Sequence, residues 1–437
     1  MNDTICAPAT TPGGAIAIIR ISGPEALSCA SALSTLCCNA VAANTIHFAR
    51  ITASVPGTSH SETSTEVIDE AMISVFHAPH SYTGEDSVEI YCHGSRYIID
   101  KVLEQLVANG CRMARPGEFT QRAYLNGKID LSQAEAVADL IASTNRTSHH
   151  LAMSQLRGGI SSELSRLREQ LLRLTSLIEL ELDFSDHEDL EFADRQELLT
   201  LAQNTDNHIA KLANSFLDGQ AIKEGIPVAI VGAPNVGKST LLNTLLNEER
   251  AIVSDVQGTT RDTIEDTMQL GGLTFRFIDT AGIRHTSDQI EQLGIDRSIA
   301  AAQRARIILM MNEPGVPYPD IPIRTDQIVI RIENKTKNFQ AKFGIGIEEL
   351  RQQLLQAVPQ ASDSDIIISN ARHYESLTHA HENLQRVMDG ITGHLPADLI
   401  SEDLRQVLSD LSEITGDGLI TPQETLNNIF SHFCVGK

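Results

Sequence analysis

The segment Gly232-Ala-Pro-Asn-Val-Gly237-Lys238-Ser239 constrains this chain more than any other stretch. It follows the apolar run 228–231 and precedes leucines at helical spacing, so it predicts a strand, a glycine-rich loop and a helix in succession. In that context backbone N–H groups can surround phosphate oxygens, Lys238 can meet the β- and γ-phosphates, and the Ser239 hydroxyl can ligate Mg²⁺. The alternative is a glycine-rich turn without a ligand.

Two downstream segments make a nucleotide site more specific. Asp279-Thr-Ala-Gly282 ends the β-like run 274–278, where a carboxylate can hold the Mg²⁺ shell and a glycine N–H can sense the γ-phosphate. Gly258-Thr-Thr-Arg-Asp262 lies between the two motifs and supplies a second hydroxyl at the position of a switch loop, the alternative being a polar surface loop. Ile283 cannot orient an attacking water, and no arginine finger can be identified, so a partner or an ion must supply positive charge.

The chain of 437 residues is long enough for about three domains at roughly 150 residues each. Short β-like runs predict an α+β domain over 1–117, and leucines spaced by three and four predict long helices over 118–221, beginning with a capping box at Ser132-Gln-Ala-Glu135. A P-loop α/β domain with a mainly parallel sheet follows over 222–367, and helical periodicity resumes over 368–437. The fold class is therefore multidomain α/β plus α, with the P-loop domain inserted into a helical domain made of two segments.

Charge and cysteine content restrict the partners and the compartment. A formal charge of −23 opposes unaided binding to a phosphate backbone, so an RNA substrate would be held mainly by a basic partner. The sequence predicts neither a signal peptide nor a membrane span. Seven cysteines without a CxxC pair fit reduced thiols, which indicates a cytoplasmic protein.

Motifs along the whole chain resemble the MnmE (TrmE) family of bacterial tRNA modification GTPases. They are Asp3-Thr-Ile, Ile19-Arg20-Ile-Ser-Gly23, Tyr82-Thr-Gly-Glu-Asp86, His93-Gly94, Arg115-Pro-Gly-Glu-Phe119, Ser132-Gln-Ala-Glu-Ala136 and Phe433-Cys-Val-Gly-Lys437. The resemblance implies a front domain for folate binding and dimerisation, a helical domain that also dimerises, and an inserted domain that hydrolyses GTP.

The resemblance also implies a folate site that would take 5-formyltetrahydrofolate or a related tetrahydrofolate. Arg20, Glu89 and Lys128 match family folate-binding positions, and Lys437 ends the tail that reaches the pocket. A carboxylate can accept paired hydrogen bonds from a pterin ring, and cations can meet a glutamate tail. Without the resemblance, each of the first three would be read as a solvated or salt-bridged surface residue. Cys434 could be a nucleophile, but its role is left open.

For the nucleotide, the resemblance implies that K⁺ replaces the arginine finger when two GTPase domains face one another. Glu291 matches the family's water-positioning glutamate, the alternative being a charged residue on an exposed helix, and it joins Lys238 and Asp279 as a candidate catalytic residue. The implied K⁺ ligands are Asn235, Ser254, Val256 and Thr259, and the Mg²⁺ ligands are Ser239 and Thr260. The full predicted nucleotide site comprises Asn235, Val236, Gly237, Lys238, Ser239, Thr240, Ser254, Asp255, Val256, Gly258, Thr259, Thr260, Asp279, Thr280, Ala281, Gly282, Asn334 and Lys335.

The base-reading segment departs from the expected Asn-Lys-x-Asp, because Lys337 stands where the carboxylate belongs. Losing a carboxylate that takes two hydrogen bonds from guanine would cost about 2 to 5 kcal/mol. Only seven residues separate Ile332 from Gln340, too few for the usual crossover helix, and Gln340-Ala-Lys342 stands in place of Ser-Ala-Lys. Either this edge of the domain is truncated or Asn334 is misaligned.

The resemblance implies a GTPase that works with a flavin-dependent, MnmG-like partner in a hetero-oligomer. The pair would install an aminomethyl or carboxymethylaminomethyl group at the wobble uridine of tRNA, with folate as the one-carbon carrier. A second reading is a nucleotide- and folate-binding protein with a damaged guanine site and little turnover, favoured by Lys337. A ribosome-assembly GTPase is the third, although residues 370–437 are an acidic helical segment instead of a basic RNA-binding module.

Overall fold

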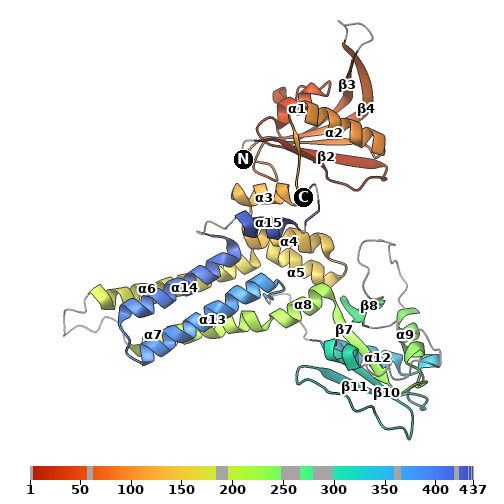
Figure 1. Ribbon diagram of the computed structural model, residues 1–437, viewed down its shortest axis with the longest axis vertical. Helices are drawn as coiled ribbons and strands as arrows, with labels where there is room; N and C mark the ends of the chain where they lie inside the picture. Colours follow the sequence, from red (N-terminus) through yellow and green to blue (C-terminus); the bar gives the residue numbers. More distant parts are fainter. Residues whose placement is uncertain are drawn as a thin grey trace. The chain divides into compact units, whose positions relative to one another are not determined.

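A computed structural model describes residues 3–56, 63–183, 195–247, 266–278, 299–358, 366–417, 423–431, 433, 434 and 436. The chain divides into two compact units (Figure 1). The first unit contains Met1–Ala138, Gln155–Ser162 and Ser412–Lys437, and the second contains Asp139–Ser154 and Glu163–Leu411. The C-terminal residues therefore belong to the same unit as the N-terminal ones.

The first unit is built on a six-stranded sheet in the order β3-β4-β5-β2-β1-β6. All neighbouring strands are antiparallel except β1 and β6, which are parallel. The strands are β1 (Ile5–Pro8), β2 (Ile16–Ser22), β3 (Thr45–Pro56), β4 (Thr63–Phe76), β5 (Ser87–His93) and β6 (Arg112–Met113). They replace the shorter β-like runs expected at 15–21, 71–76 and 87–92, so β4 begins earlier than the sequence pattern indicated.

One face of this sheet is covered and the other is open. Alternate residues such as Ile19, Ile73 and Ile90 point into a core with α1 (Ala26–Ala32) and α2 (Arg96–Ala108), together with a 3₁₀ turn at Cys38–Ala40. The residues between them, which include Phe48 at 63 % exposure, lie on the opposite face. Because strand side chains alternate, this open face also carries the paired residues Arg20 and Glu89.

The tail packs against the helices that follow the front sheet. Leu426, Phe430 and Phe433 are buried with Leu131 and Ala134, and the rings of Phe430 and Phe433 lie 5.3 Å apart. The helices concerned are α3 (Glu118–Leu125), α4 (Leu131–Ala142) and α15 (Gln423–Ser431). This packing joins the last residues of the chain to the front domain.

The start of α4 corrects the predicted capping box. The side chain of Asp130 accepts a hydrogen bond from Gln133 N–H (2.8 Å), and the side chain of Gln133 accepts one from Asp130 N–H (2.9 Å). The reciprocal box is therefore Asp130 with Gln133, and Ser132 already lies inside the helix. The sequence signature of a capping box fits both Asp130–Gln133 and Ser132–Glu135. The structure has the first, and Glu135 is buried on the helix.

Long helices form the part of the second unit outside its sheet. They are α5 (Arg146–Leu156), α6 (Gly159–Asp183), α7 (Arg195–Asn214), α8 (Phe216–Glu224), α13 (Ala371–Thr392) and α14 (Ala397–Thr415). Of these, α5, α6 and α14 each include a few residues assigned to the first unit. Leu167, Leu171 and Leu174 are fully buried, as their helical spacing predicts, and Asn370 caps α13 by accepting from Arg372 N–H (2.9 Å). Among the described helices, none is long and apolar enough to cross a membrane.

The second unit also contains a five-stranded sheet in the order β11-β10-β7-β9-β8, parallel except at β8. Its elements are β7 (Ile226–Gly232), α9 (Lys238–Asn247), β8 (Asp266–Leu270), β9 (Leu273–Phe277), β10 (Ile307–Asn312), β11 (Ile328–Glu333), a 3₁₀ turn (Ala341–Phe343) and α12 (Ile347–Gln356). β10 is buried throughout, because helical residues cover both faces of the sheet. The mainly parallel sheet predicted for this domain is thus confirmed.

The hairpin of β8 and β9 contacts the start of α5. Asn145 Nδ2 donates to Thr274 Oγ1 (2.8 Å), Gln269 Nε2 donates to Thr144 O (2.9 Å), and Thr147 N–H donates to Gly272 O (3.1 Å). The hairpin lies between the two segments, 248–265 and 279–298, that contain the predicted switch loop and Asp279. These hydrogen bonds therefore link the nucleotide-binding sheet to the helical residues of the same unit.

Candidate functional site

The phosphate loop connects the end of β7 to the start of α9, as the sequence predicts. Glycine is required at positions 232 and 237 because a side chain would clash with its neighbours. An added Cβ would lie 2.4 Å from Met311 O at Gly232 and 2.5 Å from Asn334 Nδ2 at Gly237. Gly237 has φ +99° and Asn235 has φ +60°, which is left-handed backbone. The loop is thus a tight turn that leaves backbone N–H groups at a helix N-terminus, the geometry that suits phosphate oxygens.

Lys238 is folded back onto this loop. Its Nζ donates to Gly232 O (2.8 Å) and Ala233 O (2.9 Å), and burial lowers its pKa from the usual range. Ser239 follows at the second position of α9, and Thr240 beside it is exposed. A bound triphosphate would replace the two carbonyl contacts with anionic partners for the lysine.

Asn334 joins the phosphate loop to the loop that precedes α12. Its Nδ2 donates to Val236 O (2.8 Å), and its Oδ1 accepts from Ala341 N–H (3.1 Å), while the residue itself is only 5 % exposed. Lys335 Nζ lies 3.5 Å from Asn235 O and pairs with Glu313. The structure therefore brings Asn334 and Lys335 to the side of the phosphate loop.

The short connection after β11 is accommodated by a truncated edge. Within the described residues the sheet ends at β11, and the chain turns back through a hydrogen bond between Thr336 N–H and Phe339 O (3.1 Å). Of the two alternatives that the spacing left open, the structure has the shortened edge with Asn334 at the phosphate loop. Lys337 lies exposed in this turn.

A second candidate site lies on the open face of the front sheet. Arg20 pairs with Glu89 (2.8 Å), and Tyr91 Oη donates to the other carboxylate oxygen of Glu89 (2.7 Å). The guanidinium lies 5.4 Å from the ring centre of Tyr82 and 5.6 Å from that of Phe119. Both members of the ion pair keep 17 % of their side-chain surface exposed, so this pair remains accessible to a ligand.

The C-terminal tail reaches this second site. Arg20 Nη1 donates to Gly436 O (3.3 Å), and Gly117 N–H donates to Cys434 O (3.4 Å). Gly436 has φ +94°, and an added Cβ would lie 2.2 Å from Pro8 O, so the tail passes too close to β1 for a side chain at this position. Cys434 itself is exposed.

Several predicted site residues lie outside the described part of the chain. They are Ser254, Asp255, Val256, Gly258, Thr259, Thr260, Asp279, Thr280, Ala281, Gly282, Glu291 and Lys437. Lys128 is described, is exposed, and donates from Nζ to Pro79 O (3.0 Å). Among the residues that the structure covers, no group of three or more His, Cys, Asp or Glu side chains could hold a metal ion.

Family models match nearly the whole chain. Residues 4–128 match the model described as GTP-binding protein TrmE N-terminus, and residues 131–434 match the model described as MnmE helical domain. The chain belongs to the MnmE family. Curated relatives named tRNA modification GTPase MnmE include those of Phocaeicola vulgatus (50 % identical, covering 100 % of this chain and 99 % of that protein), Bacteroides fragilis (48 %, 100 % and 100 %) and Parabacteroides distasonis (50 %, 99 % and 100 %).

The alignments also show that this MnmE family member has fewer residues than the alignments have positions. The alignment with the Phocaeicola vulgatus protein extends over 495 positions, whereas this chain has 437 residues. The chain therefore lacks residues at some aligned positions. The short connection between β11 and Ala341 agrees with such a loss.

Sequence reasoning missed three aromatic residues of the front site in this MnmE family member: Tyr82, Tyr91 and Phe119. Burial raises the pKa of both tyrosines, so they remain neutral hydrogen-bonding groups at ordinary pH. The period of two along β5 places Tyr91 on the same face as Glu89, and that signal could have identified it. Tyr82 and Phe119 come from separate segments, which only the tertiary structure brings to Arg20.

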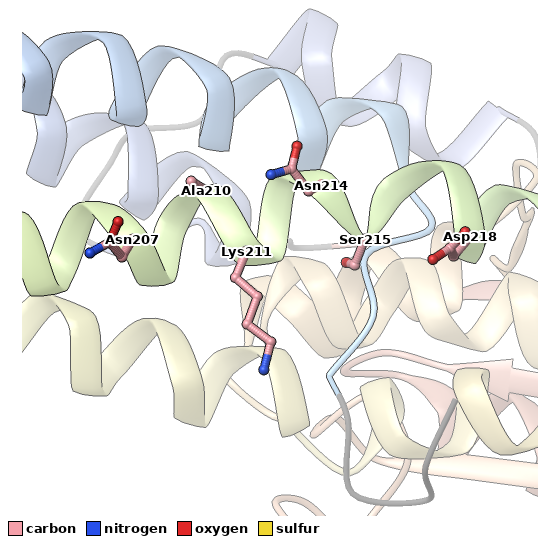
Figure 2. A pocket seen from close by; sticks show the side chains of 6 residues that line it. All are labelled: Asn207, Ala210, Lys211, Asn214, Ser215 and Asp218. Carbon is pink, nitrogen blue, oxygen red and sulfur yellow. The ribbon is translucent and has the colours of Figure 1, made fainter. Parts of the chain in front are cut away.

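An open hollow of about 550 Å³ lies elsewhere in the second unit (Figure 2). It is lined by Asn207, Ala210, Lys211, Asn214, Ser215 and Asp218, from α7 and the start of α8. Two of these side chains already make contacts within the protein: Ser215 Oγ accepts a hydrogen bond from Ile368 N–H (3.0 Å), and Asp218 pairs with Arg306 (2.6 Å). No predicted site residue lines the hollow.

Proposed function

We propose that this MnmE family member hydrolyses GTP and acts in the modification of the wobble uridine of tRNA. The observation that carries the proposal is the phosphate loop, in which Gly232 and Gly237 permit a tight turn against Met311 and Asn334 and Lys238 is held at the N-terminus of α9. The names of relatives that are 48 to 50 % identical support the same activity.

Hydrolysis requires that water attack the γ-phosphorus while the bond to the β–γ bridging oxygen breaks. Lys238 would leave the carbonyls of Gly232 and Ala233 and neutralise the oxygens of the β- and γ-phosphates. Loop N–H groups would hold the same oxygens, and Glu291 would orient the water, a role that Ile283 cannot fill. These residues supply positioning and charge, which are the main needs of phosphoryl transfer.

Metal ions would complete the nucleotide site. Ser239, Thr260 and Asp279 would hold Mg²⁺ directly or through its water shell, and Asn235, Ser254, Val256 and Thr259 would hold K⁺. Ser239 and Asn235 fit these roles by position, because both lie in the phosphate loop or the first turn of α9. Bound cations supply positive charge where negative charge develops between the β- and γ-phosphates.

The front site would bind 5-formyltetrahydrofolate or a related tetrahydrofolate. The Glu89 carboxylate can accept paired hydrogen bonds from a pterin ring, while Arg20, Lys128 and Lys437 can meet carboxylates. The rings of Tyr82 and Phe119 offer apolar surface beside the ion pair. The tail would also contribute to this site, because Gly436 O accepts a hydrogen bond from Arg20. We assign no role to Cys434.

We also propose a cytoplasmic homodimer that associates with an MnmG-like flavoprotein, which would hold most of the tRNA. The open sheet face supports dimerisation, because Ile46, Phe48 and Met72 expose apolar surface beside the folate site. The charge of −23 supports delegation of tRNA binding to a partner. The proposed domains are 1–117 (front), 118–221 and 368–437 (helical) and 222–367 (GTPase).

The test is steady-state GTP hydrolysis by the full-length protein in KCl and in NaCl at matched ionic strength, with Lys238→Ala as the inactive control. We expect K⁺ to raise the rate by about tenfold or more, because one preorganised charge at the developing anion has effects of that size or larger. Equal rates in the two salts would contradict the K⁺ role. A rate equal to that of Lys238→Ala in both salts would contradict GTP hydrolysis.

A second candidate function is nucleotide and folate binding with little turnover. Lys337 favours it, because a cation stands where guanine needs an acceptor. The same assay separates the two candidates when it is accompanied by folate titration: binding without hydrolysis supports the second.

A further inference from the structure

The loop of residues 334–342, here called the base loop, is fixed at both ends beside the phosphate loop. At its start, Asn334 donates to Val236 O, and Lys335 Nζ lies 3.5 Å from Asn235 O. At its end, Ala341 N–H donates back to Asn334 Oδ1 (3.1 Å). Thr244 Oγ1 on α9 also donates to Ala341 O (2.9 Å), so this end is tied to the helix that carries the phosphate site.

These anchors keep Lys337 close to Asn334, which lies at the phosphate loop. Lys337 is the third residue after Asn334, so the two Cα atoms lie at most about 11 Å apart. The turn closed by Thr336 N–H and Phe339 O, with Thr336 Oγ1 accepting from Phe339 N–H (3.1 Å), shortens the path further.

The base loop is cationic in a strongly acidic protein. Residues 334–346 contain no aspartate or glutamate, and they contain three lysines: Lys335, Lys337 and Lys342. The carboxylate of Glu313, which follows β10, is engaged by Lys335. Lys342 Nζ lies 5.8 Å from the ring centre of Phe343. The base loop itself therefore supplies donors and positive charge, and no carboxylate acceptor.

Guanine needs the opposite chemistry at this edge. Its N1–H and its 2-amino group are both donors, and a carboxylate can accept from both, whereas an ammonium group has three donors and no acceptor. Xanthine carries an oxygen acceptor at C2 and loses a ring proton near neutral pH, so lysines would attract it. Hypoxanthine has no group at C2 and would meet neither attraction nor repulsion there. A protein often gains specificity because its donors face the donors of the wrong ligand, which weakens binding of that ligand.

We propose that Lys337 makes this site prefer a purine nucleotide with an acceptor at C2, as in xanthine nucleotides, over a guanine nucleotide. The proposal rests on the proposed function, because it concerns the nucleotide that the same phosphate loop binds. Lys337 acts as a specificity residue at the base and has no part in the hydrolytic step. Hypoxanthine nucleotides fall between the other two in affinity.

The test is isothermal titration calorimetry of the full-length protein with XDP, IDP and GDP in Mg²⁺ and K⁺. We expect XDP to bind about tenfold more tightly than GDP, which is the order of effect of one mismatched polar group. Lys337→Asp should reverse the order, and Lys337→Ala should bring the affinities for XDP and GDP close together. Arg304→Asp, which makes the same change of charge at an exposed residue of the same unit, should leave the wild-type order unchanged.

The outcomes separate this inference from the proposed function. Equal affinities of the wild-type protein for the three diphosphates, or tighter binding of GDP, would overturn the base preference and leave the GTPase proposal standing. Failure of all three to bind would overturn both. Because the wild-type order alone decides the question, the test does not depend on whether a Lys337 variant folds.

Discussion

Replacing Asn334 by alanine should weaken nucleotide binding more than any other single change in the base loop. The Asn334 side chain is buried and makes two hydrogen bonds, to Val236 O (2.8 Å) and from Ala341 N–H (3.1 Å). Alanine would remove both and leave the two backbone groups without this partner. At about 1 to 2.5 kcal/mol for each buried group, the variant should lose about 2 to 5 kcal/mol of the free energy that holds the phosphate loop and the base loop together.

This loss should appear mainly in nucleotide affinity, because the phosphate loop must be ordered before a nucleotide can bind. An energy of that size corresponds to a Kd that rises by about 30-fold to several thousandfold. The assay is titration calorimetry with GDP and XDP, and thermal unfolding without nucleotide measures the cost to the fold. Asn334→Asp is the companion variant of the same shape: it keeps an acceptor for Ala341 N–H, but it loses the donation to Val236 O and sets a buried carboxylate oxygen against that carbonyl, so its loss should be at least as large as that of the alanine variant.

The reasoning would be refuted if Asn334→Ala bound diphosphates as tightly as the wild-type protein while unfolding at the same temperature. An aspartate variant that bound diphosphates as tightly as the wild-type protein would contradict the role given to the donation to Val236 O.

Three further predictions concern the first unit. Glu89→Gln should weaken 5-formyltetrahydrofolate binding about tenfold in calorimetry, because it removes both the charge that pairs with Arg20 and one acceptor. Unchanged affinity would exclude Glu89 from the site. Gly436→Ala should displace the tail, since its Cβ would lie 2.2 Å from a carbonyl oxygen, and hydrogen exchange at the tail amides should become faster; unchanged exchange would contradict the close approach. Burial opposes ionisation of Glu118, but hydrogen bonds from Arg112 and nearby groups outweigh it and lower the pKa of the carboxyl group. The ionised carboxylate therefore stabilises the folded protein above the unfolded pKa near 4.3, and this contribution is lost as pH falls through the lower folded pKa. Acid unfolding followed by circular dichroism should therefore be shallower in Glu118→Gln, and an identical profile would refute the linkage.

Local chemistry made the phosphate site predictable. A strand, a left-handed glycine turn and a helix N-terminus follow one another within residues 226–247, so the described contacts that shape the loop, apart from those with Met311, Asn334 and Lys335, lie close in sequence. Helical periodicity likewise identified the buried stripe of α6, because one face of a helix repeats its apolar residues at fixed spacing. The capping box was placed two residues late, since the pattern alone fits two overlapping segments and packing decides between them.

Other features depended on contacts between distant residues. The seven-residue spacing after β11 predicted that a crossover helix would not fit, but only the hydrogen bonds from Asn334 to Val236 and from Ala341 to Asn334 showed that Asn334 lies at the phosphate loop. The folate-site residues came from family resemblance, since nothing in the local pattern around Arg20 distinguishes a ligand site from an ordinary ion pair.

The sequence by itself determined the phosphate loop, the order of the domains, the buried helical stripes and the absence of a carboxylate in the base loop, because each is a property of neighbouring residues. Only the tertiary structure decided that Tyr82 and Phe119 surround Arg20, that Gly436 reaches the same side chain from the other end of the chain, and that Asn334 and Lys335 contact the phosphate loop. These arrangements arise from packing and hydrogen bonds between segments far apart in sequence, which no local spacing encodes.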